Sequence, residues 1–178
     1  MFKKVGGLLG AALISLSALG SAEATGFTGA PVGSTVTAVN TTALSSGSFA
    51  QCTGHTWNGP VTVDNGPGAG GSIAIQASVF SGCTYLGSPM VVAPVGLPWT
   101  LTLNGSGGGT LTYGYQRAFP GVSCNFVGTV GATFNNATGI LAVSGSVTRV
   151  SGGFPCAASE TVSVSWRLRG VTGANLAL

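Results

Sequence analysis

Few residues of this chain could carry catalysis. His55 is the single histidine, and Asp64 and Glu160 are the side-chain carboxylates that follow the first 24 residues. His55 and Asp64 could join one of the many serines in a Ser-His-Asp triad, or the two carboxylates could serve as acid and nucleophile of a glycosidase. No Gly-x-Ser-x-Gly elbow lies between a strand pattern and a helix pattern, so a triad lacks its usual setting. We expect surface carboxylates, no catalytic residue and no enzyme.

The cysteines are the next reactive group, and all four follow residue 24: Cys52, Cys83, Cys124 and Cys156. No two are close in sequence and one histidine accompanies them, which argues against zinc; we expect no metal and no cofactor. An even number of cysteines in an exported chain indicates two disulfides, for which three pairings exist. We favour Cys52–Cys83 and Cys124–Cys156, because nearest-neighbour pairing joins elements that are expected to be adjacent in an antiparallel sheet.

Charge is scarce, at 5% of the chain. After residue 24 there is no lysine, and the cations are Arg117, Arg149, Arg167 and Arg169. Nucleic-acid binding requires a clustered basic face that neutralises several phosphates, so we expect no nucleic-acid partner. A phosphate-binding loop requires Gly-Lys-Ser/Thr at the start of a helix, so the glycine-rich stretches 68–71 and 107–109 are interpreted as flexible turns.

Apolar side chains offer another route to function. Trp57 lies in a segment predicted to be a loop, which makes it the best candidate for an exposed aromatic, whereas Trp99 and Trp166 lie in alternating segments and are assigned to the core. The apolar run 90–97 is interrupted by proline and glycine, and is either a buried loop or an exposed patch that contacts oil, another subunit or a cell surface. The candidates for apolar contact are Trp57, Met90, Val91, Val92 and Leu97.

The first 24 residues have the pattern of a cleavable signal peptide. Lys3 and Lys4 precede an uncharged apolar run, Val5 to Leu19, and Ala22-Glu23-Ala24 gives the small-x-small cleavage pattern. The apolar run is shorter than the roughly 20 residues that cross a bilayer. We therefore expect a protein that is secreted to the cell envelope or the extracellular space, with no transmembrane span in the mature chain.

Alternation of apolar and polar residues dominates the rest of the chain. Val162, Val164, Trp166 and Leu168 share one face of a segment whose other face is polar, which is typical of a half-buried strand. Helix signals are nearly absent, and a hydrophobic content of 44% argues for order despite 31 glycines. The predicted strands are 35–39, 60–64, 72–80, 89–92, 99–103, 110–115, 125–130, 140–150 and 161–169.

Short strands at this spacing predict an all-β fold: a single disulfide-stapled antiparallel β-sandwich or small barrel after the signal peptide. A glycine-rich stretch, 104–109, is predicted to be a hairpin loop between two of the strands. The expected division is a signal peptide at 1–24, a flexible arm or edge strand at 25–48, and a β-rich domain at 49–178.

Two short motifs resemble a known family. Phe80-Ser81-Gly82-Cys83 and Gly96-Leu97-Pro98-Trp99, with one cysteine before and two after, are similar to those of the alkane-oxidation activator proteins (PraB-like) over roughly residues 52–169. The resemblance implies a small exported bacterial protein with a β-rich mature domain that helps growth on hydrocarbons. It implies no catalytic residue.

Three functions remain open at this point. The first is a secreted, non-enzymatic accessory protein that aids contact with apolar substrates, for which the low charge and the run 90–97 argue. The second is a structural subunit of an extracellular fibre or biofilm matrix, with residues 35–39 donated to a neighbour's sheet. The third is a carbohydrate-binding module that uses Trp57 and Tyr85. The expected partners are hydrocarbon or cell-surface material, with self-association as a further option.

Overall fold

The computed structural model describes residues 27–47, 50–66 and 68–178, and within them the chain is all-β and antiparallel, as predicted. The predicted signal peptide lies outside the described residues. The strands are β1 (Thr35–Asn40), β2 (Leu44–Ser46), β3 (Ala50–Asp64), β4 (Gly70–Ile75), β5 (Ala77–Tyr85), β6 (Ser88–Pro89), β7 (Val91–Pro94), β8 (Trp99–Asn104), β9 (Gly108–Phe119), β10 (Val122–Asn135), β11 (Ile140–Ser151) and β12 (Ser159–Arg169).

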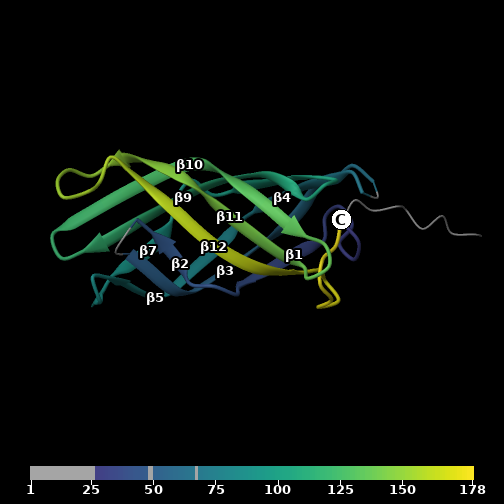
Figure 1. Ribbon diagram of the computed structural model, residues 1–178, viewed down its shortest axis with the longest axis horizontal. Helices are drawn as coiled ribbons and strands as arrows, with labels where there is room; N and C mark the ends of the chain where they lie inside the picture. The colour runs from purple at the N-terminus through teal and green to yellow at the C-terminus, as the bar shows by residue number, and fades with distance from the viewer. Residues whose placement is uncertain (1–26, 48–49, 67) are drawn as a thin grey trace, which may run out of the picture.

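The sheet closes on itself. Its strand order runs β1-β12-β11-β10-β9-β8-β4-β3, and β3 pairs in turn with β1. Figure 1 shows these strands wrapped around one long axis. Closure leaves the eight strands of this ring with hydrogen-bonded neighbours on both sides, and it places their inward faces around one shared core.

The prediction of a flexible arm or edge strand at 25–48 is wrong for its described residues. β1 lies between β12 and β3, with Thr37 opposite Arg169 on one side and opposite Asn58 on the other. β2 likewise pairs with both β12 and β3. The ring could not close between β12 and β3 without these two short strands, so they are interior members of the sheet.

β3 is long enough to take two successive neighbours on one side. Its second half pairs with β4 and its first half pairs with β5. The strand predicted at 72–80 is therefore two strands, separated at Gln76, whose backbone N–H donates to the Asn58 carbonyl at 3.0 Å. β8 pairs with the other edge of β4, and this pairing ends at Ile75 and Trp99. β5 follows β4 in the chain and is not paired with β8.

A pair of glycines decides which side chains of β3 point inward. Cys52 is buried, and two positions later the inward phase would fall on Gly54, but the buried residues that follow are His55 and Trp57. A Cβ on Gly54 would clash with the Ser81 side chain, and Gly82, opposite on β5, has a φ of +58°. Because glycine tolerates both demands, the two strands change phase together.

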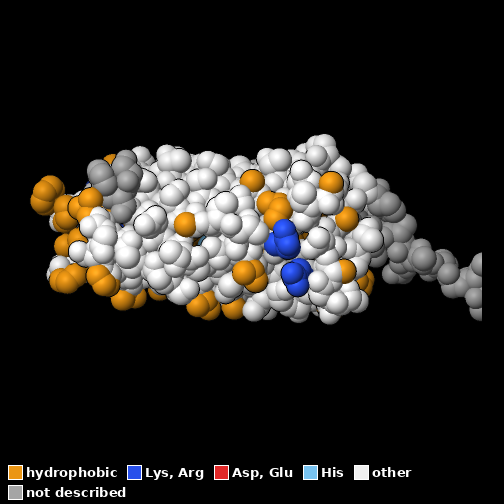
Figure 2. Space-filling model, turned by 60° about the horizontal axis from the view of Figure 1, so that its bottom comes forward, with side chains coloured by type: hydrophobic (Ala, Val, Ile, Leu, Met, Phe, Trp, Pro, Cys, Tyr) orange, Lys and Arg blue, Asp and Glu red, His pale blue; other side chains and the backbone are white. Residues whose placement is uncertain are grey.

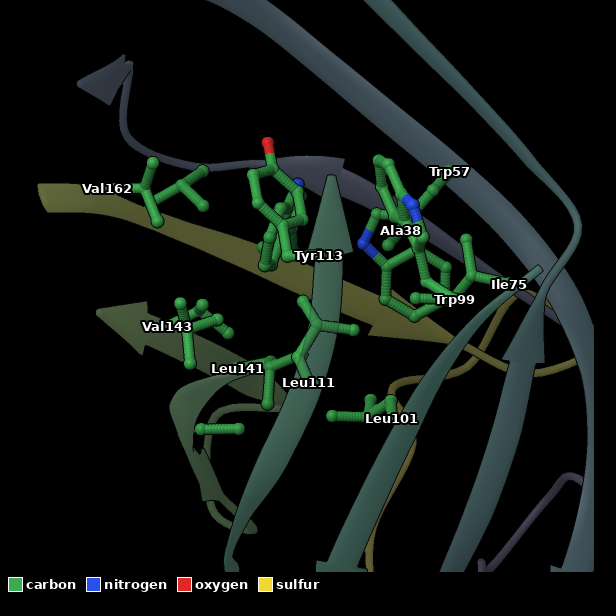
Figure 3. Packing of buried hydrophobic residues seen from close by; sticks show 14 of the residues in the cluster. Ala38, Trp57, Ile75, Trp99, Leu101, Leu111, Tyr113, Leu141, Val143 and Val162 are labelled. Carbon is green, nitrogen blue, oxygen red and sulfur yellow. The ribbon is translucent and has the colours of Figure 1, made fainter. Parts of the chain in front are cut away.

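The buried side chains of the ring form one continuous hydrophobic cluster. Figure 3 shows Trp57, Trp99 and Tyr113 gathered above Leu111 and Leu141. The alternation read from 161–169 is confirmed, since the apolar positions of β12 are buried and the polar positions between them lie outward or half-buried. Fully burying one such side chain contributes about 1.5–3 kcal/mol, so this core is the main source of stability.

Candidate functional site

Trp57 is not an exposed aromatic. It lies within β3 and is 3% exposed, with its ring centroid 6.1 Å from that of Trp166 in an edge-to-face arrangement. The prediction was wrong because the segment around Trp57 continues the strand instead of forming a loop, and the phase change at Gly54 turns Trp57 inward. A glycan site built on Trp57 is therefore excluded.

His55 is also enclosed in the core. Its Nε2 atom lies 2.9 Å from the Ser78 Oγ atom, and its ring stacks on Phe80 with the centroids 4.1 Å apart. Burial lowers the pKa of His55 to about 3, so the imidazole is neutral at physiological pH. Asp64 lies nine residues further along the same strand, about 30 Å away at strand spacing. The structure therefore does not bring His55 and Asp64 together as a triad would require.

The run 90–97 is divided between the core and the surface. Met90 is buried, Val92 and Leu97 are half-buried against the core, and Val91 is 69% exposed. β7 pairs with β9, and this pairing turns successive side chains to opposite faces. The run therefore does not form a continuous contact surface. The prediction of Met90 as a contact residue is wrong, because Met90 is buried, whereas Val91 is exposed.

An apolar surface exists, but neighbouring loops build it. We call it the apolar end: the loops at 86–87, 120–121 and 152–155, with Val91. Phe154 is 98% exposed and Leu86 is 65% exposed. Figure 2 shows hydrophobic side chains gathered at the tip of the molecule, with the visible arginines well away from it. An apolar hollow of about 350 Å³ lies beside them, lined by Pro89, Met90, Val91, Ala118, Phe119 and Pro120.

Specific contacts hold these loops together. The Tyr85 ring stacks on Phe119, with 5.4 Å between centroids and 5° between planes, and so joins the 86–87 turn to the 120–121 turn. The Cys124–Cys156 disulfide ties the 152–158 loop to the start of β10, and the Cys52–Cys83 disulfide joins β3 to β5. The predicted pairing of the cysteines is confirmed. The Cys124–Cys156 disulfide and the Tyr85–Phe119 contact thus restrain the loops of the apolar end.

A buried polar cluster lies beneath the apolar end. Arg117 and Glu160 form an ion pair through Nη2 and Oε1, and both side chains are buried. Glu160 Oε2 accepts hydrogen bonds from Ser46 Oγ at 2.5 Å and from the Tyr115 hydroxyl at 2.8 Å. Burial raises the pKa of Tyr115 above its usual value, so the phenol stays protonated and donates to the carboxylate.

The expectation that Glu160 is a surface carboxylate is wrong. Glu160 falls on the same alternation as Val162 and Val164, and therefore points into the ring. Arg117 falls in the same way on the alternation that begins at Leu111 and Tyr113. The alternation along each strand could have shown this in the sequence. A charged residue at an inward-facing position is buried with the apolar residues of the same face.

The buried pair borders a second hollow, of about 300 Å³, at the surface. We call it the polar hollow; it lies between the end of β2, the end of β5 and the loop before β12. Among the described residues, Arg117 Nε is a buried donor with no hydrogen-bond partner. The residues that line the polar hollow are Ser46, Gly47, Tyr85, Arg117, Pro155, Ala157, Ser159 and Glu160.

The part of the chain that the structure describes contains no group of three or more histidine, cysteine, aspartate or glutamate side chains placed to hold a metal ion. Within residues 27–47, 50–66 and 68–178, no helix has the length and hydropathy needed to cross a membrane.

Comparison with known proteins shows a family. The profile of the family described as alkane oxidation protein activator PraA/PraB-like matches residues 2–171, nearly the whole chain. No curated protein and no solved structure matches the sequence.

Proposed function

The chain belongs to the alkane oxidation protein activator PraA/PraB-like family, and we propose that it acts as a secreted, non-enzymatic accessory protein that aids contact with apolar substrates. Two disulfides support an oxidising compartment outside the cytoplasm. The enclosure of the single histidine in the core supports a role in contact instead of catalysis.

The observation that carries this proposal is the apolar end. Its loops, 86–87, 120–121 and 152–155, together with Val91, contain no charged side chain, and Leu86, Val91 and Phe154 are their exposed large hydrophobic residues. A charge close to these loops in sequence is that of Arg149, whose guanidinium donates to the Cys156 carbonyl. Transfer of such side chains from water to an apolar phase gains about 25 cal/mol per Å². Because the disulfides and the Tyr85–Phe119 stack hold the loops in place, little conformational entropy is lost on contact.

The alternative of a fibre subunit with a donated strand at 35–39 gains no support. Both sides of β1 already carry backbone hydrogen bonds within its own chain, to β12 and to β3. A strand donated to a neighbour has to leave at least one of these partners.

Partition onto hexadecane droplets tests the proposal. We expect the folded, oxidised protein to bind droplets, and the variant Leu86→Ser, Val91→Ser, Phe154→Ser to bind several-fold less. The control is Val32→Ser, Val79→Ser, Val171→Ser, which removes three exposed apolar side chains elsewhere on the surface; these are 59–63% exposed, against 65–98% for the three at the apolar end. Circular dichroism before and after adsorption verifies that each protein is folded.

Equal losses in the two variants would show that adsorption follows general hydrophobicity and would contradict a dedicated apolar end. Failure of the folded protein to bind droplets at all would remove direct contact with hydrocarbon as its function.

A further inference from the structure

The Arg117–Glu160 ion pair lies at the base of the polar hollow, and a contribution to stability does not explain its presence there. Glu160 is one of two side-chain carboxylates among the described residues, yet it is buried with Arg117 instead of facing water. Removing two charges from water costs several kcal/mol per ion, and apolar residues of similar volume are often as stable or more stable. A chain so poor in charge therefore keeps its most costly charges at the edge of a surface hollow.

The hollow is lined by groups that can hydrogen-bond a ligand. Arg117 and Glu160 form part of this lining, although the Nε atom of Arg117, which has no partner among the described residues, is itself buried. Glu160 Oε1 accepts from Arg117, and a carboxylate oxygen can accept a second hydrogen bond. The hydroxyl groups of Tyr85 and Ser159, which also line the hollow, can both donate and accept.

The charge and shape of the hollow restrict its ligand. The ion pair has no net charge, so a charged ligand is attracted by one partner and repelled by the other, with little net gain to offset its own desolvation. A neutral ligand whose adjacent hydroxyl groups donate to Glu160 and accept from Arg117 meets both groups at once. Pro155 and Ala157 add apolar wall, against which C–H groups can pack.

The hollow also limits the size of the ligand. Its volume of about 300 Å³ is at the lower end of the range for small-molecule pockets, which suits a single ring. Tyr85 has Phe119 stacked on its ring and the Arg117 guanidinium 5.3 Å from its ring centroid, so it contributes its hydroxyl and its edge instead of a free stacking face. Recognition would therefore depend mainly on hydrogen bonds.

We propose that the polar hollow binds a neutral pyranose sugar, with ring hydroxyl groups on Arg117 and Glu160 and a C–H face toward Pro155. The glycan site predicted from the sequence used Trp57 and Tyr85. Trp57 is buried, whereas Tyr85 is one of the residues that line the polar hollow. The sugar site does not depend on the proposed contact with hydrocarbon, because the polar hollow and the apolar end use different side chains except where the 152–158 loop borders both.

Nuclear magnetic resonance titration of the ¹⁵N-labelled, oxidised protein tests the proposal. The probes are the methyl α-pyranosides of glucose, mannose and galactose, with sodium glucuronate as the charged comparison. We expect at least one methyl glycoside to bind saturably with a Kd of about 1 mM, typical of few hydrogen bonds. The amide shifts should centre on residues 46–47 and 157–160, and glucuronate should bind several-fold more weakly.

Two variants make the titration decisive. Ala157→Trp fills the hollow from an exposed position without altering the core, and we expect it to weaken binding at least tenfold. Ala137→Trp adds the same side chain at an exposed turn between β10 and β11 and should leave binding unchanged.

Saturable binding that survives Ala157→Trp would place the sugar elsewhere and overturn the proposal. The absence of saturable shifts with all three glycosides, in a protein whose spectrum shows it to be folded, would also overturn it. Both results are independent of the droplet experiment, so each proposal can fail alone.

Discussion

The His55 Nε2 atom lies 2.9 Å from the Ser78 Oγ atom, and the two residues lie on adjacent strands, β3 and β5. The His55 ring is enclosed by aromatic neighbours, with Phe80 stacked at 4.1 Å and Trp166 edge-on at 5.1 Å between centroids. This pair is a buried polar contact among aromatic side chains, separate from the Arg117–Glu160 cluster, and its protonation has a measurable consequence.

Acid should destabilise the protein through His55. Burial lowers its folded-state pKa to about 3, from an ordinary value of 6.5. Below pH 6.5 the unfolded chain binds a proton that the folded chain refuses, so the free energy of unfolding falls as the pH falls from 6.5 toward 3. We expect a loss of roughly 2 kcal/mol between about pH 7 and pH 5 in urea unfolding experiments.

The double variant His55→Leu, Ser78→Ala provides the control for this pH effect, because it removes the titrating group without leaving an orphaned hydroxyl. Its unfolding free energy should be nearly constant in the same window. An equal slope in both proteins would assign the pH dependence to other groups.

Removing one partner of the buried ion pair should be severe. Glu160→Gln leaves Arg117 charged and buried without a counter-charge, and such changes cost about 3–5 kcal/mol. The double variant Arg117→Met, Glu160→Met removes both charges and should recover most of that loss. Urea unfolding of the three proteins measures both steps; a single variant as stable as the parent would mean that the pair is solvated.

The Cys124–Cys156 disulfide should matter for both stability and the apolar end. It closes a loop with a sequence separation of 32, and the chain-entropy relation gives about 3–4 kcal/mol for a loop of this size. In Cys124→Ser, Cys156→Ser, we expect that loss in unfolding experiments. We also expect faster proteolysis within 152–158, measured by mass spectrometry under conditions where the protein remains folded.

The corresponding variant of the other disulfide, Cys52→Ser with Cys83→Ser, serves as the comparison. It should lose comparable stability without exposing the 152–158 loop to protease. Cleavage in that loop to the same extent in both variants would contradict a local restraint by Cys124–Cys156.

Substitution of Trp57 should lower the stability of the protein without changing its binding to hydrocarbon droplets. Trp57→Ala removes a buried ring that packs on Trp166, which costs about 3–5 kcal/mol. Droplet binding by the fraction that remains folded should equal that of the parent protein. A loss of droplet binding with unchanged stability would restore Trp57 as a contact residue.

The fold class could be read from the sequence because strand alternation is local. The period of two along 161–169, and the glycine-rich loop at 104–109, follow from side-chain geometry within one strand or turn. The Cys52–Cys83 pairing is favoured because cysteines that are neighbours in sequence are expected on adjacent strands. The two residues are direct partners across β3 and β5. These features depend on residues that are close in sequence or on adjacent strands, so a local pattern is enough to predict them.

Features that depend on distant pairing could not be read in this way. The closure of the ring by β1 requires contacts with β12, more than a hundred residues away, and no local pattern distinguishes such a strand from a free arm. The turn of Trp57 into the core depends on a phase change that Gly54 and Gly82 make jointly from different strands.

The sequence by itself determined the all-β class and the scarcity of charge, because each depends on residue type or short-range periodicity. It favoured one disulfide pairing among three, and the folded structure decided between them. The tertiary structure decided which charges are buried, which hydrophobic side chains remain in water, and where the two hollows lie. Arg117 meets Glu160, and Tyr85 and Pro155 line one hollow, since closure of the sheet brings the ends of distant strands together. Burial and proximity are properties of that closed packing, and no single strand contains them.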